Sequence, residues 1–314
     1  MPEPILEPAR PSPAPAIAPV TASADWPADE YHVTNEWGTF RIVRTRPFGY
    51  LRVDPSPSPE FLANFYATAY RNPTRVVHPE VYVALLRRSA PELFADPPAR
   101  QLLEIGAGGG EVLRAFSAAG FRTFGFEPGQ GDYDACRAAG LELHHGMYDE
   151  SVARARGSFD VCVLVNVLEH TPDPQGLLTS LRALAGAGTR LLLVVPNDFN
   201  QLQRAFVQAR KAPLWFLSPP DHLNYFQPHT LDALLAHCGW RPRVRTTRFP
   251  MELFLVSGRD YVQDPTLGRA CHLERVEFER TLLAHGVDVL LDFYEGLASK
   301  GFGREIVIVA DPAP

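Results

Sequence analysis

Cysteine is scarce in this sequence, and the few cysteines present are not arranged to bind a metal or to form a disulfide framework. The chain has four, with no Cys-x-x-Cys pair among them: Cys136, Cys162, Cys238 and Cys271. A zinc ribbon is therefore unsupported, and a disulfide framework is not expected. Cys162 and Cys238 lie within apolar runs, where we expect small buried side chains.

Long apolar runs and an excess of positive charge are also missing. No run of about 18 apolar residues occurs, so we expect no membrane span. The formal net charge of −6 provides no overall basic field for nucleic acid. Residues 1–28 are rich in proline and alanine. We predict a disordered tail there, with no secretory signal because prolines interrupt it, and by default a cytoplasmic protein.

The most informative stretch is a glycine-rich turn between an apolar run and a helical pattern. Leu102, Leu103 and Ile105 form a short apolar run that stops at Gly106, and residues 111–116 have the pattern of a helix start. Glycine lets the backbone turn sharply and approach a ligand. The free amides at a helix start favour a polar or anionic ligand group.

Two nucleotide-type interpretations compete for this turn. The dinucleotide fingerprint Gly-x-Gly-x-x-Gly needs glycine at position 111, where the chain has Glu111. The spacing present, Glu104-x-Gly106-x-Gly108-x-Gly110, resembles motif I of the class I S-adenosylmethionine-dependent methyltransferases. This resemblance implies S-adenosyl-L-methionine as the cofactor. An oxidoreductase with a nicotinamide cofactor is the alternative.

Strand and helix patterns alternate from residue 101 onward, which predicts a parallel sheet covered on both faces. The resemblance implies a Rossmann-like α/β sheet of seven strands, with the last strand antiparallel beside the sixth. We expect this cofactor-binding domain to span 97–314, with a helical insertion at 250–304. The predicted strands are 101–106, 122–127, 141–145, 159–165, 190–195, 241–247 and 305–310.

Residues 29–96 are predicted to form a small N-terminal lobe of short strands and helices. Ser58, followed by Pro59 and Glu60, is typical of a helix start. The arrangement of 31–70 is similar to the leader of some bacterial methyltransferases that act on sugars and other small molecules. We expect the lobe and the insertion either to cover the ligand edge of the sheet or to form a homodimer contact.

Ligands of an open parallel sheet bind at the carboxyl ends of its strands, and several candidate residues stand there. Glu127 ends the second strand, where an acid either accepts two hydrogen bonds from a ribose diol or caps the next helix. Met147 follows the third strand, where it either presses on the adenine ring or belongs to the core. The implied cofactor-binding set is Glu104, Gly106, Ala107, Gly108, Gly110, Glu127, Pro128, Gly146, Met147, Tyr148, Asn166, Val167 and Leu168.

A second match to this family lies after the fourth strand. Residues 166–174 read Asn-Val-Leu-Glu-His-Thr-Pro-Asp-Pro. The run resembles the Leu-Glu-His-x-Pro-Asp-Pro signature of small-molecule methyltransferases, including the ubiquinone-biosynthesis O-methyltransferases. Some of those relatives carry Glu-x-x-Glu-His and bind a divalent metal. Asn166 stands in place of the first Glu, so we expect no metal site.

Two histidines are candidates for the general base that removes a proton from the acceptor. The ordinary pKa of a histidine such as His170, about 6.5, suits this task, although a buried histidine can equally serve to orient the backbone. His222, in the loop after the fifth strand, is either the rival base or an anchor for that loop. Trp215, Phe216 and Tyr225 either wall an apolar acceptor pocket or pack among themselves.

These residues favour an S-adenosylmethionine-dependent methyltransferase with a small-molecule acceptor and no nucleic-acid or membrane partner. Oxygen is the preferred methyl acceptor because two histidines are available, and nitrogen or carbon stays open. One alternative is an NAD(P)-dependent oxidoreductase, against which Glu111 argues. The other is a methyltransferase-like binding protein without turnover, because a fold alone does not guarantee activity.

Overall fold

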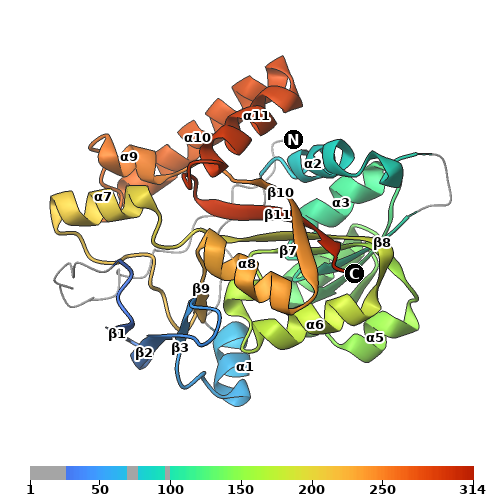
Figure 1. Cartoon of the computed structure of the whole chain (residues 1–314), viewed down its shortest axis with the longest axis horizontal. Coiled ribbons are helices and arrows are strands. Elements are labelled where there is room, and N and C mark those ends of the chain that lie inside the picture. Colours follow the sequence, from blue (N-terminus) through green and yellow to red (C-terminus); the bar gives the residue numbers. More distant parts are fainter. Residues whose placement is uncertain (1–25, 69–76, 96–99) are drawn as a thin grey trace.

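The main body of the protein is a seven-stranded sheet with helices on both faces (Figure 1). The computed structural model describes residues 26–68, 77–95 and 100–314. Neighbouring strands are parallel, except that the last strand is antiparallel to both of its neighbours. The predicted α/β sheet, with its last strand beside the sixth, is therefore confirmed. In spatial order the strands are β10 (Trp240–Thr246), β11 (Glu305–Pro312), β8 (Ala185–Pro196), β7 (Phe159–Val165), β4 (Gln101–Ile105), β5 (Arg122–Glu127) and β6 (Leu143–His145).

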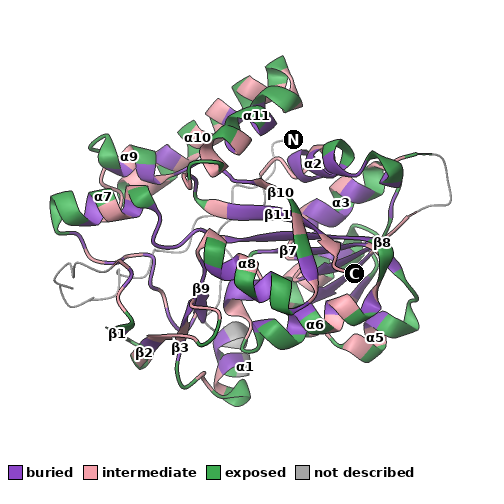
Figure 2. Ribbon diagram, in the orientation of Figure 1, coloured by how far each residue is buried: buried purple, intermediate pink, exposed green. Residues whose placement is uncertain are grey.

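Strand β7 shows why this sheet is buried on both faces. Val161 and Val163 belong to one hydrophobic core, and Cys162 and Leu164 belong to the other. The alternation follows because successive side chains of a strand point to opposite faces. Figure 2 shows the strands of the sheet buried and the outer surfaces of the helices exposed.

The helices divide between these two cores. The first face is covered by α2 (Glu80–Ser89), α3 (Glu111–Ala118) and α11 (Val287–Ala298), and the second by α6 (Pro174–Leu184) and α8 (Pro228–His237). No helix among the described residues is both long and apolar enough to cross a membrane. The remaining helices up to β9 (Asn224–Tyr225) are η1 (Pro91–Leu93), α4 (Gln130–Ala138), α5 (Glu150–Ala155), η2 (Leu168–His170) and α7 (Gln201–Arg210), besides α1 (Pro59–Thr68) of the N-terminal segment.

A second, antiparallel sheet joins the N-terminal segment to the loop after β8. Its strands, in order, are β1 (Glu30–Asn35), β2 (Gly38–Arg44), β3 (Leu51–Val53) and β9 (Asn224–Tyr225). The Val53 amide also donates to the main-chain oxygen of Leu223 at 2.9 Å. The N-terminal strands therefore hold the segment that carries His222. Helix α1 (Pro59–Thr68) follows β3 and begins as predicted, because the Ser58 hydroxyl accepts from the Phe61 amide at 3.1 Å.

Two features of the N-terminal region differ from the sequence prediction. Trp26, placed in the disordered tail, is packed: its indole nitrogen donates to the main-chain oxygen of Phe199 at 2.9 Å, and the ring centroids are 5.3 Å apart. Helix α2, placed in the N-terminal lobe, packs instead against α3 and α11 in the core of the main sheet. The rest of the predicted tail, residues 1–25, lies outside the described residues.

The insertion between β10 and β11 contains α9 (Glu252–Val256), α10 (Thr266–His285) and α11, as the helical pattern predicted. A buried charge network ties α10 to its neighbours. Glu279 in α10 is fully buried and accepts hydrogen bonds from the Arg275 guanidinium at 2.7 Å and from the Tyr294 hydroxyl of α11. Arg248, just after β10, lies 3.5 Å from the same carboxylate.

We expect Glu279→Gln to destabilise the protein by about 3–5 kcal/mol, because it leaves the buried Arg248 cation without its partner. The matched control is Glu277→Gln on the same helix, whose carboxylate is mostly exposed and pairs with Arg280. That pair should contribute less than about 1 kcal/mol. Urea unfolding of both variants measures the difference, and equal effects would show that the network does not hold the insertion.

Candidate active site

The glycine turn after β4 has the backbone shape that the sequence predicted. Gly106, Gly108 and Gly110 have φ angles of 71°, 51° and 74°, in the left-handed region that favours glycine. A Cβ atom on Gly106 would lie 2.6 Å from a methyl carbon of Val167, and one on Gly110 would lie 2.5 Å from a methyl carbon of Leu141. Side chains at these positions would collide with their neighbours, so the turn requires glycine.

Glu127, at the end of β5, is buried against this turn. One carboxylate oxygen accepts from the Gly108 amide at 2.7 Å, and the other accepts from the Gly129 amide at 2.6 Å. Burial raises the pKa of Glu127, while these two amide bonds act in the opposite direction. The side chain therefore fixes the glycine turn and also binds the residue before α4. Each oxygen keeps a further lone pair for a ligand donor.

The residues after β6 behave differently from one another. Met147 is 63% exposed, so the alternative in which it belongs to the core is wrong and its side chain is open to a ligand. Tyr148 is half-buried: its hydroxyl is 2.7 Å from the Ser180 hydroxyl on α6, and its ring contacts Phe126 edge-on. Tyr148 is thus anchored to the second core and remains partly exposed.

The run after β7 enters η2 through a left-handed residue. Asn166 has a φ of 54° and an exposed side chain, and its amide donates to the main-chain oxygen of Val194 at 3.0 Å. Val167 is half-buried and lies beside Gly106. Leu168 is fully buried in the second core. The prediction that Leu168 lines the cofactor site is therefore wrong, because protein atoms already enclose its side chain.

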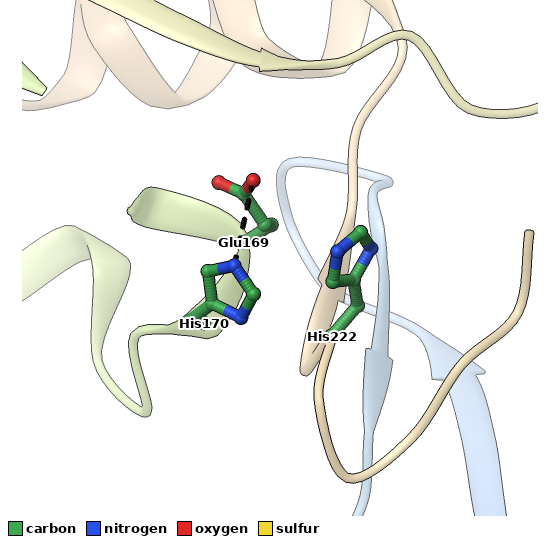
Figure 3. A group of neighbouring side chains, drawn as sticks. All are labelled: Glu169, His170 and His222. Carbon is green, nitrogen blue, oxygen red and sulfur yellow. Dashed lines mark ion pairs between the residues drawn. The ribbon is translucent and has the colours of Figure 1, made fainter. Parts of the chain in front are cut away.

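Glu169, His170 and His222 gather beyond the carboxyl end of β7 (Figure 3). The Nε2 atom of His170 is 3.7 Å from Glu169 Oε1, and the two imidazole centroids are 4.9 Å apart. The Nδ1 atom of His170 lies 2.6 Å from the main-chain oxygen of Asp221 and 3.3 Å from its Oδ1. Figure 3 shows His222 approaching the group from a separate segment of the chain. The two predicted base candidates are therefore neighbours.

Burial and neighbouring charges move the pKa values of the two histidines apart. Burial alone would lower the pKa of His170, but the hydrogen bond to Asp221 and the charges of Glu169 and Asp221 raise it to about 9. Burial and the charge of His170 lower the pKa of His222 to about 4. Burial raises the pKa of Glu169 to about 7, and neither of its oxygens has a hydrogen-bond partner. At neutral pH, His170 is therefore charged, His222 is neutral and Glu169 is near its midpoint.

An NMR titration of the imidazoles should show His170 losing its proton near pH 9 and His222 near pH 4. The pKa of His170 lies above its ordinary 6.5, so the stability that this cation adds is complete below pH 6.5 and is lost as the pH rises through about 9. Asp221→Asn should move the pKa of His170 back toward 6.5, whereas Asp264→Asn at the exposed start of α10 should not. Both wild-type histidines titrating near 6.5 would refute this charge pattern.

Comparison with known proteins agrees with this geometry. A family model described as a methyltransferase domain matches residues 78–243 of the 314, more than half of the chain. The chain belongs to this methyltransferase family. Its last strand runs antiparallel beside the sixth, as the resemblance to class I S-adenosylmethionine-dependent methyltransferases implied.

Similar proteins include the ubiquinone biosynthesis O-methyltransferases of Aromatoleum aromaticum (26% identical over 151 residues) and Ruegeria sp. (26% over 163 residues). The two matches cover 45% and 48% of this chain. They cover 63% and 65% of the two relatives, so the chain spans less than two thirds of the length of either. Among solved structures, it is similar to S-adenosylmethionine-dependent methyltransferases of Archaeoglobus fulgidus (18% identity, 81% of this chain, all of that chain, TM-score 0.44) and Clostridium acetobutylicum (8% identity, 81% and 99%, TM-score 0.46).

The glycine turn of the methyltransferase fits S-adenosyl-L-methionine, the cofactor of the family. The turn leaves no room for side chains at Gly106 and Gly110, so no side chain at these positions covers its main chain. Glu104 is buried, and its Oε2 atom has no hydrogen-bond partner. Glu127 stands at the next strand end with lone pairs to spare. These polar atoms suit the amino-acid and ribose parts of the cofactor.

The Glu169 group also has the composition of a metal site, which the sequence did not predict. Glu169, His170 and His222 each offer one ligand atom, and these atoms lie within 4.8 Å of one another. Asn166, on which the sequence argument depended, points to solvent and is outside this group. A histidine ligand must be neutral, whereas Asp221 holds His170 as a cation. A metal ion at this group would therefore compete with the proton on His170.

The predicted acceptor wall is not where the sequence placed it. Phe216 and Tyr225 are 8% and 1% exposed and pack in the core beneath the N-terminal strands, and the half-buried Trp215 packs against Phe206 and Phe216. The Tyr225 hydroxyl donates to the main-chain oxygen of His222 at 3.0 Å, so this residue supports the site from behind. Aromatic residues in a long loop served packing, and sequence pattern alone does not separate that role from ligand contact.

Proposed function

We propose that this methyltransferase transfers the methyl group of S-adenosylmethionine to a small molecule and removes the acceptor's proton at the Glu169 group. The observation that carries the proposal is the buried Glu169 carboxyl, which has a raised pKa and no hydrogen-bond partner. It stands at the strand end next to the glycine turn, because Val167 of the same run lies beside Gly106. When bound, the cofactor supplies a methyl group already activated on a sulfonium.

The chain's own residues then align the acceptor and move one proton. Glu169 suits the role of base, because its pKa of about 7 matches the working pH. His222 is neutral and is the second candidate proton acceptor. His170 is charged at neutral pH and orients Glu169, so we assign it a positioning role in place of the base role expected from the sequence.

Oxygen is the acceptor atom that this arrangement serves best. A hydroxyl must lose its proton as the methyl group arrives, and a carboxylate without competing hydrogen bonds can take it. The relatives are named as O-methyltransferases, which supports the same preference. An amine acceptor has less need of a base of this kind.

The proposal is tested by incubating the full chain with methyl-labelled S-adenosylmethionine and a panel of phenols, sugars and amino alcohols. We expect S-adenosylhomocysteine to form only when an acceptor is present, with label recovered on oxygen. Cofactor binding without transfer to any member of the panel would instead indicate a binding protein. Label recovered on nitrogen would contradict the oxygen preference alone.

A further inference from the structure

A second set of buried polar side chains lies next to Glu169. Asp198, just after β8, is 3% exposed, and Glu252 of α9 is fully buried. Asp198 Oδ2, Glu252 Oε2 and the hydroxyl of Tyr261 are all buried without a hydrogen-bond partner. Asp198 interacts electrostatically with Glu169 and Glu252, and Tyr261 interacts with Glu252, so the side chains are neighbours. Buried polar atoms are nearly always bonded, so three unbonded atoms on neighbouring side chains point to a missing partner group.

The backbone brings Asp198 and Glu169 to the same place. Strands β7 and β8 run parallel, with Val165 opposite Val194. Glu169 lies four residues after Val165, and Asp198 lies four residues after Val194. One short segment bonds to both: the Leu223 amide donates to the Glu169 main-chain oxygen at 2.8 Å, and the Asp198 amide donates to the Phe226 main-chain oxygen at 3.0 Å. The set is thus continuous with the proposed proton-transfer site.

Negative charge exceeds positive charge in this set. Arg304 lies 3.4 Å from Glu252 Oε1, and Gln203 donates to the same oxygen at 3.1 Å, which leaves Oε2 unbonded. His170, a second cation, lies between Glu169 and Asp221 and pairs with those two acids. Burial and the charges of Glu169 and Glu252 raise the pKa of Asp198 well above its ordinary value, and the charge of Arg304 offsets them only in part. An ammonium group has three donors and a positive charge, and it supplies what these atoms lack.

We propose that Asp198, Glu252 and Tyr261 form a subsite for a protonated amine on the acceptor, beside the hydroxyl that receives the methyl group. The acceptor class is therefore an amino alcohol. This inference rests on the proposed methyl transfer, because it places the amine next to the Glu169 group. The ammonium donates to the two carboxylates and to the Tyr261 oxygen, while Arg304 stays on the opposite oxygen of Glu252.

The test uses the full chain saturated with S-adenosylhomocysteine and three two-carbon probes of matched size: ethanolamine, ethylene glycol and glycolate. Ligand-observed NMR titration should show ethanolamine binding at least about tenfold more tightly than ethylene glycol, with glycolate weakest, because a charged hydrogen bond distinguishes them. Asp198→Asn and Glu252→Gln should each reduce the preference for ethanolamine to less than about threefold. Asp232→Asn, a surface acid on α8 that pairs with Arg245, should leave it unchanged.

Ethanolamine binding no more tightly than ethylene glycol would overturn the subsite, as would a preference that survives both substitutions. Binding of Mg²⁺ at this set, with ethanolamine excluded, would also overturn it, because a metal would then neutralise the acids. Calorimetry with S-adenosylhomocysteine on each variant shows whether the fold and cofactor site persist. If the wild-type chain did not bind S-adenosylhomocysteine, the proposed function itself would be contradicted. If it bound S-adenosylhomocysteine and showed no preference for ethanolamine, only this inference would be contradicted.

Discussion

Replacing Glu169 by glutamine is expected to lower kcat about 100- to 10,000-fold, while the affinity for S-adenosylhomocysteine stays within about twofold of the wild-type value. Glutamine keeps the shape of the side chain and cannot accept the acceptor's proton. The wild-type rate should rise with pH and level off above about 7, because the base must be deprotonated and burial holds the pKa of Glu169 near that value. Initial rates across pH, with the best acceptor from the panel, measure both effects.

Two further variants make this result specific. Glu142→Gln changes an exposed acid that pairs with Arg156, far along the chain from the site, and should alter neither rate nor affinity. His170→Asn should shift the pH profile of the rate, because removing the neighbouring cation raises the pKa of Glu169 further. If Glu169→Gln keeps the wild-type kcat and His222→Asn loses activity, His222 is the base and Glu169 is not.

Replacing Glu127 by alanine is expected to weaken S-adenosylhomocysteine binding about 100-fold or more. We expect the carboxylate to accept hydrogen bonds from a ribose diol, and each charged hydrogen bond contributes about 1.5–3 kcal/mol. The same change removes the bonds that hold the Gly108 and Gly129 amides at 2.7 and 2.6 Å, so the glycine turn loses its support as well. Isothermal titration calorimetry measures the loss directly.

Glu127→Gln separates the two causes. The amide keeps the size of the side chain and one acceptor oxygen, so this variant should retain part of the turn's support. Its affinity for S-adenosylhomocysteine should lie between those of the wild type and of Glu127→Ala. Glu111→Gln, one residue after the turn in α3, serves as the neighbouring acid control and should stay close to wild type. An unchanged affinity for S-adenosylhomocysteine in Glu127→Ala would show that Glu127 does not bind the ribose of the cofactor.

The sheet was predictable because its signals are local. The apolar runs of β4 and β8 are closed by Gly106 and Pro196, and β7 is itself an apolar run. The left-handed angles at Gly106, Gly108 and Gly110 explain why the turn consists largely of glycine. The packing of α2 on the main sheet and the pairing of β3 with β9 depend on residues far apart in the sequence. Nothing in the local pattern of either segment specifies such a partner.

The candidate site was predictable in part for the same reason. The sequence placed His170 just after the fourth strand and His222 in the loop after the fifth, and the structure brings their ring centroids to 4.9 Å from each other. Their opposite pKa shifts depend on burial and on Asp221, which no spacing reveals. The lack of a hydrogen-bond partner at Asp198 Oδ2 and Glu252 Oε2 is likewise a property of the folded chain, because these acids come from separate elements.

The central claim is that the turn at residues 106–110 holds S-adenosylmethionine. Isothermal titration of the wild-type chain with S-adenosylhomocysteine tests it most directly, with NADH titrated in parallel. One equivalent of S-adenosylhomocysteine should bind with micromolar affinity or better, and NADH should give no binding heat. If NADH bound and S-adenosylhomocysteine did not, the claim would be contradicted. The result would instead favour the NAD(P)-dependent oxidoreductase, against which Glu111 argues.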